Sequence, residues 1–94
     1  MDRGLPGEEL VRKGIEDLDE RVESVEALLV SIGAPRLRRL GLSIREPLPS
    51  PEDRLYDLLA AEDSDSAHSR YNALVRRLVR FERAAEALGA AADA

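Results

Sequence analysis

Two series of apolar residues, spaced alternately by four and three positions, constrain this chain more than any other feature of its sequence. Residues three and four apart lie on the same face of an α-helix, so each series predicts a helix that packs along one apolar seam. Their members are Val11, Ile15, Leu18, Val22, Val25, Leu29 and Ile32 in the first series, and Tyr71, Leu74, Leu78, Phe81, Ala85 and Leu88 in the second. The sequence therefore predicts an all-α fold.

The first series predicts a long helix near the start of the chain. Gly33 followed by Pro35 is a typical stop signal, so the simplest interpretation is one continuous helix over residues 8–32. The alternative is a break near residues 19–23, with Ser24 as the N-cap of a second helix. We prefer the continuous helix, because the apolar period does not slip across this stretch.

Local signals predict the remaining elements. We expect residues 35–40 to form a short helix, because proline suits a first turn and Gly41 follows as a terminator. Residues 42–50 contain two prolines and form an extended connection. A Ser-Pro pair followed by two acidic residues predicts a helix over residues 51–62, and the last seam predicts a helix over residues 66–88.

These elements predict a single helical domain over residues 1–94, with residues 1–7 and 90–94 frayed. The expected architecture is a small bundle of three main helices and one short helix, in which the long first and last helices pack along heptad-like seams. A domain of 94 residues is marginally stable by itself, and the last helix carries a second apolar edge, so we expect a homo-oligomer, in the first instance a dimer. The residues assigned to packing or to the interface are Tyr71, Leu74, Val75, Leu78, Val79 and Phe81.

The composition narrows the chemistry that the chain can perform. It contains no Cys, which removes disulfides, thiol nucleophiles and thiolate metal sites. No Gly-rich phosphate loop and no Glu-x-x-His motif occurs, so no cofactor or metal is expected. The start of the chain lacks a signal-peptide pattern, and no segment approaches the roughly 20 apolar residues that span a bilayer. We therefore expect a cytoplasmic protein without a membrane partner.

Charge is segregated along the chain, which has 19 acidic and 14 basic residues and a net charge of −5. One hypothesis is an Arg-rich site for an anion or a nucleic acid, formed by Arg36, Arg38, Arg39, Arg76, Arg77, Arg80 and Arg83. The other is that these arginines pair with the acidic first and third helices, within one chain or across a dimer. We favour pairing, because the net charge repels polyanions and no aromatic residue is interleaved among the arginines to stack on bases.

A second candidate cluster lies at the start of the last helix and consists of His68, Arg70, Tyr71 and Asn72. A histidine near carboxylates is a possible general base or metal ligand. Near a helix start, however, His68 more commonly serves in capping or hydrogen bonding, and Tyr71 is a seam residue that needs a polar partner for its hydroxyl. Catalysis at this cluster is therefore the less favoured interpretation.

The segment Ser24–Leu42 resembles a helix-turn-helix in outline, with Gly33 at the turn and an Arg-rich second helix. That second helix is only about six residues long, so we do not favour sequence-specific DNA binding. The preferred hypothesis is a helical protein–protein interaction module that associates with itself and has no identifiable catalytic activity. The alternative is an anion- or nucleic-acid-binding module that uses the Arg-rich faces at residues 36–39 and 70–83.

Overall fold

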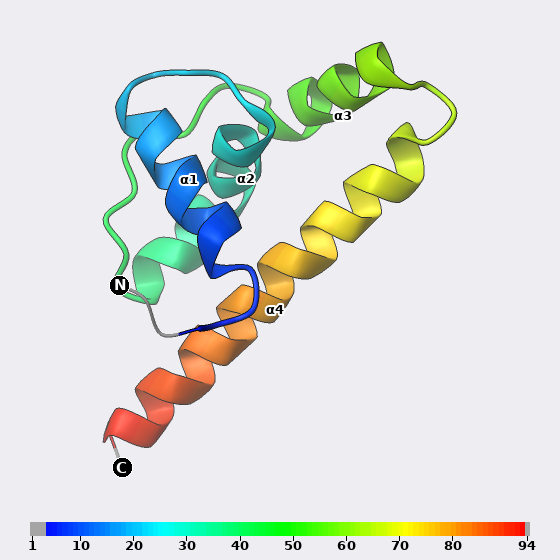
Figure 1. The fold of residues 1–94 in the computed structure, drawn as a ribbon. Coiled ribbons are helices and arrows are strands. Elements are labelled where there is room, and N and C mark those ends of the chain that lie inside the picture. The colour runs from blue at the N-terminus through cyan, green and yellow to red at the C-terminus, as the bar shows by residue number, and fades with distance from the viewer. Residues whose placement is uncertain (1–3, 94) are drawn as a thin grey trace.

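The computed structural model describes residues 4–93. Within this range the chain forms four helices and no strand: α1 (Glu8–Asp19), α2 (Val25–Arg39), α3 (Pro51–Glu62) and α4 (Ala67–Asp93). α1 and α2 share the most extensive contact, α3 packs against α2, and α4 runs along one side of the other three (Figure 1). The Cα extents of 46 × 26 × 20 Å show an elongated molecule. The predicted all-α class is confirmed.

The end of α1 shows that the predicted continuous helix over residues 8–32 is wrong. The amide of Arg21 donates to the carbonyl of Leu18 at 3.0 Å, and the amide of Val22 donates to the carbonyl of Asp17 at 2.8 Å. These two bonds form a Schellman turn, whose left-handed position is usually a glycine. Arg21 holds that position here with a φ of 56°. The helix therefore ends without a glycine signal in the sequence.

The start of α2 follows directly and agrees with the alternative that the sequence offered. Ser24 has an extended backbone, and its hydroxyl oxygen accepts a hydrogen bond from the amide of Ala27 at 3.0 Å. This bond satisfies one of the amides left free at a helix start. Val22, in the intervening turn, is 46% exposed, so the apolar period crosses the break without forming one buried face.

α2 continues through the predicted stop signal, which corrects a second expectation. Gly33 and Pro35 both lie inside the helix, and residues 35–40 are its last turn and C-cap rather than a separate short helix. Pro35 is exposed, so its ring lies on the solvent side of the helix. Since no turn interrupts α2 near Gly33, the resemblance of residues 24–42 to a helix-turn-helix is also wrong.

The extended connection over residues 42–50 is tied to α2 by hydrogen bonds, of which the one between Leu48 and Ser31 is buried. The hydroxyl of Ser31 accepts from the amide of Leu48 at 3.1 Å and donates to a carbonyl one turn earlier in its own helix. The guanidinium of Arg38 donates twice to the carbonyl of Ile44, at 3.1 and 3.0 Å. Ile44 and Leu48 are themselves buried, so this segment is part of the core.

The two remaining helices lie close to their predicted positions. α3 occupies residues 51–62 as expected, and α4 begins one residue after the predicted start. α4 then continues past Gly89 to Asp93 instead of ending near residue 88. Residues 1–3 and 94, which belong to the segments predicted to fray, lie outside the described residues.

The core is aliphatic and centred on α2. It draws six residues from that helix, three each from α1 and α4, and two each from α3 and the connection. The buried apolar residues are Leu10, Val11 and Leu18; Ala27, Leu28, Leu29, Val30, Ala34 and Leu37; Ile44 and Leu48; Leu55 and Leu59; and Ala67, Leu78 and Phe81. α4 therefore contributes few buried side chains for a helix of 27 residues.

Candidate interaction surface on helix α4

The predicted interface residues of α4 fall into two groups that differ in burial. Leu78 and Phe81 are buried in the core of the single chain. Tyr71, Leu74, Val75 and Val79 are only partly buried, although the first three pack against that core. These four residues form what we call the apolar edge of α4, which keeps part of its apolar surface in contact with water.

The outer side of α4 carries three of the arginines that the sequence analysis singled out. Arg76, Arg80 and Arg83 are all exposed and follow the helical spacing of four and three residues, so they share one face. Among the side chains of residues 4–89, no acidic group lies within ion-pair distance of any of the three. We call this set the Arg face of α4.

Arg77 does not belong to the Arg face, although it is next in sequence to Arg76. It lines a shallow hollow at the start of α1 together with Glu8 and Glu9. A Cβ atom on Gly7 would lie 2.9 Å from the backbone carbonyl oxygen of Arg77, so the chain entering α1 crosses α4 very closely at this point. Gly7 also has a φ of 77°, a conformation that favours glycine.

The arginines of residues 36–39 contact different parts of the molecule. Arg36 reaches α4, where its guanidinium lies 3.8 Å from Glu82 and 3.3 Å from Glu86. Arg38 donates to backbone carbonyls of the connection, including that of Arg45 at 2.9 Å. Arg39 is exposed. The structure thus uses two of these three arginines to hold its own elements together.

Glu82 is the most unusual acidic residue of α4, because it is only 4% exposed. It lies against α2 where Gly33 leaves room: a Cβ there would be 3.1 Å from the Oε2 atom of Glu82 and 3.0 Å from Leu78. Burial raises the pKa of the Glu82 carboxyl, and the charge of Arg36 only partly opposes this increase. The ion pair with Arg36 therefore only partly offsets the energetic cost of burying the ionised Glu82 carboxylate.

The cluster predicted around His68 does not converge on one point. Asn72 lies 3.2 Å from the Nε2 atom of His68 on the exposed side of α4, whereas Arg70 turns toward α3 and pairs with Glu62 at 3.0 Å. Tyr71 packs against Tyr56 of α3, with ring centroids 6.1 Å apart. Burial raises the pKa of the Tyr71 hydroxyl. These contacts are those of a helix-packing region and present no aligned nucleophile and base.

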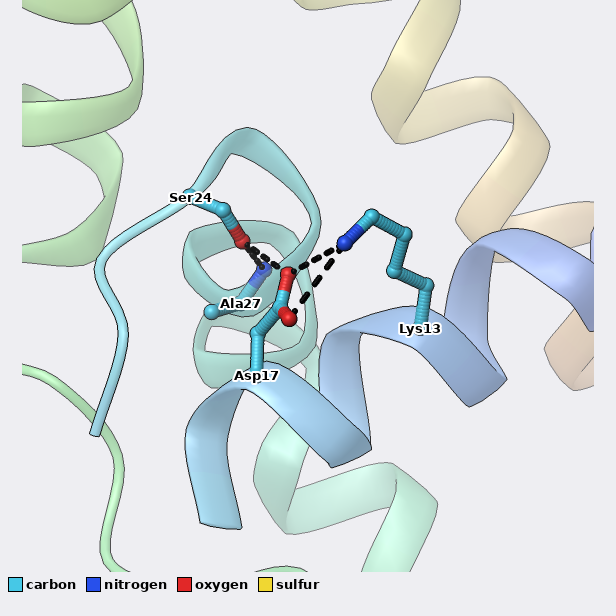
Figure 2. Close-up of polar contacts among 4 residues, drawn as sticks. All are labelled: Lys13, Asp17, Ser24 and Ala27. Atoms are coloured by element: carbon cyan, nitrogen blue, oxygen red, sulfur yellow. Dashed lines mark hydrogen bonds and ion pairs between the residues drawn. The ribbon is translucent and has the colours of Figure 1, made fainter. Parts of the chain in front are cut away.

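The best-defined polar network lies at the α1–α2 junction and was not singled out from the sequence (Figure 2). Asp17 accepts from the hydroxyl of Ser24 at 2.7 Å and from the ammonium of Lys13 at 3.0 Å, while Ser24 caps α2 through Ala27. The hydrogen bond from Ser24 and that from Lys13 lower the pKa of the Asp17 carboxyl. The spacing of four between Lys13 and Asp17 was a visible signal, but the link to Ser24 depends on the turn.

The described residues give no sign of a metal centre or a membrane segment. Among residues 4–93, no three His, Cys, Asp or Glu side chains gather closely enough to hold a metal ion. Within the same range, no helix combines the length and apolar character needed to cross a bilayer. Comparison with protein-family models, curated proteins and solved structures found no match for the chain.

Proposed function

We propose that this protein is a helical protein–protein interaction module that associates with a second copy of itself through α4. The supporting observation is the apolar edge formed by Tyr71, Leu74, Val75 and Val79, which the other three helices leave partly exposed. Burying such an edge against a partner removes apolar area from water, at roughly 25 cal/mol per Å². A dimer is the simplest closed assembly and compensates for the small core of a 94-residue chain. We propose that it acts in the cytoplasm.

The test is the absolute mass of the protein by light scattering on a sizing column. We expect a dimer at micromolar concentration that persists at high salt, and a shift toward monomer for Val79→Glu, which places a charge on the apolar edge. The matched control is Val22→Glu in the α1–α2 turn, where the valine is already 46% exposed. A wild-type monomer at about 100 μM, a concentration that populates even weak dimers, contradicts the proposal.

The second candidate function is binding of an anion or a nucleic acid, which the unpaired Arg face favours. The net charge of −5 argues against it, and Phe81, the aromatic residue between Arg80 and Arg83, is buried in the core and cannot stack on a base. Recording the nucleic-acid absorbance across the same chromatographic peak distinguishes the two. A monomer that carries nucleic acid at low salt and releases it at high salt would replace self-association with this function.

A further inference from the structure

The Arg face of α4 is costly for an isolated chain. Arg76 and Arg80 are four residues apart, and Arg80 and Arg83 are three apart, so each neighbouring pair places like charges on adjacent turns. Such pairs destabilise a helix by a few tenths of a kcal/mol each. Among residues 4–89, no acid forms an ion pair with any of these three arginines. The face is therefore best compensated from outside the chain.

A matching acidic surface lies on α3. Glu52, Asp53 and Asp57 are exposed, and none of them lies within 4 Å of a basic side chain among the described residues, although the charge of Asp57 also acts on Arg54 of the same helix. Asp53 and Asp57 are four residues apart, which equals the separation of Arg76 and Arg80. Tyr56, 40% exposed and adjacent to Asp57, offers an aromatic ring on which a guanidinium can stack. We call Asp53 and Asp57, which lie one turn apart on the same side of the helix, the acidic face of α3.

The two faces do not meet within one chain. α3 and α4 are consecutive helices in contact, yet the ion pair that joins them is Glu62 with Arg70 at their linked ends. The Arg face begins six residues further along α4 and is directed away from Leu78 and Phe81, which are buried against the rest of the molecule. Both faces are thus available to a partner at the same time.

We infer that the Arg face of α4 docks on the acidic face of α3 of a second copy of the chain. In a two-fold dimer this contact forms twice, because each copy presents both faces, and the opposite charges compensate in pairs. This inference rests on the proposed self-association and adds to it the surfaces that set the orientation of the two copies. A nucleic acid would use only the Arg face and would be repelled by the acidic face.

A charge exchange tests the inference. The first variant carries Arg76→Glu and Arg80→Glu, and the second carries Asp53→Lys and Asp57→Lys. We expect each alone to raise the dimer dissociation constant about tenfold or more, because like charges then face one another, and an equimolar mixture to form a heterodimer. Sedimentation equilibrium of each variant and of the mixture gives the constants, and circular dichroism verifies that each is folded. The matched control, Arg39→Glu with Arg45→Glu, makes the same charge change away from both faces.

The outcomes separate this inference from the proposed function. A wild-type monomer overturns both. A wild-type dimer that survives Arg76→Glu with Arg80→Glu overturns the docking arrangement and leaves self-association through the apolar edge. Loss of the dimer in either variant without recovery in the mixture also overturns the pairing of these two faces. Binding of a single-stranded oligonucleotide probe that is lost in the Arg variant, in a protein that stays monomeric, assigns the Arg face to nucleic acid.

Discussion

The α1–α2 pair and helix α4 are held in contrasting ways. α1 and α2 join through a Schellman turn, a serine cap and the Asp17 network, and they pack so closely that a Cβ on Gly14 would lie 2.4 Å from the carbonyl oxygen of Glu26. α4 spans about 40 Å but has three buried apolar side chains, and Leu88 near its end is 38% exposed. We therefore expect truncation of a buried side chain to cost more in the α1–α2 pair than truncation near the end of α4.

The largest expected difference between the two regions comes from leucine truncation. Leu28 of α2 has no exposed surface, so we expect Leu28→Ala to lower the free energy of unfolding by about 3 kcal/mol or more through lost burial and a cavity. Leu88→Ala in α4 serves as the control and should cost less than about 1 kcal/mol. Urea denaturation followed by circular dichroism measures both. Similar losses in the two variants would refute the contrast.

Glycine replacement should change stability in opposite directions in the two regions. Gly14→Ala introduces a Cβ 2.4 Å from both the Glu26 carbonyl oxygen and a methyl of Val30, so the helices must separate, at a cost of about 2 kcal/mol. Gly89→Ala in α4 meets no atom within 4 Å and should stabilise its helix by up to about 1 kcal/mol. Thermal unfolding of both variants checks the signs. A neutral Gly14→Ala would mean that α1 and α2 are less closely packed.

A smaller effect is expected from the serine that caps α2. Ser24→Ala removes the bond to the Ala27 amide and the bond to Asp17, and should cost about 1 kcal/mol. Ser50, which precedes α3, makes no side-chain capping bond and is the matched control, so Ser50→Ala should change stability by less than about 0.5 kcal/mol. Equal effects in chemical denaturation would show that the cap does not hold the junction.

The smallest expected effects are in the pH dependence, and they have opposite signs in the two regions. The pKa of Asp17 is lowered, so its stabilising contribution is present above its ordinary pKa and is lost as the pH falls through the lowered value. The pKa of Glu82 is raised, so its contribution to stability is lost as the pH rises from its ordinary pKa through the raised value.

The variants Asp17→Asn and Glu82→Gln separate these two effects. At pH 7 we expect Asp17→Asn to be less stable than wild type, with the difference shrinking in strong acid. Glu82→Gln should be at least as stable as wild type at pH 7, because the neutral amide avoids the burial penalty on the carboxylate. Unfolding measured from about pH 3 to pH 7, a range that spans ordinary carboxyl pKa values, gives both slopes. A destabilised Glu82→Gln at pH 7 would show that the Arg36 ion pair outweighs burial.

Short-range signals in the sequence predicted those features that depend only on neighbouring residues. The proline at the start of α3 predicted that helix correctly. Arg76, Arg80 and Arg83, spaced by four and three residues, lie on one exposed face of α4. The break after Asp19 was missed, because its left-handed position is an arginine instead of a glycine. Gly33 was wrongly interpreted as the end of a helix. It lies inside α2, where the missing side chain leaves room for α4.

Contacts between distant segments could not be predicted from spacing. Nothing in the sequence connects Arg36 with Glu82 and Glu86, or Arg38 with the carbonyls of the connection, because both contacts depend on how the folded elements cross. These two arginines were therefore grouped in a hypothetical anion site, whereas in the structure both contact other elements of the same chain. The homodimer and the surfaces that would form it remain proposals.

The bonds that Ser31 and Arg38 make to the extended connection have a consequence for how the molecule opens. The amide of Leu48 and the carbonyl of Ile44 find their partners on α2 instead of in water. Exchange of the Leu48 amide proton with solvent then requires the segment to leave α2. The Leu48 amide should accordingly exchange together with the amides of α2, so this loop marks no boundary between independently opening parts of the chain.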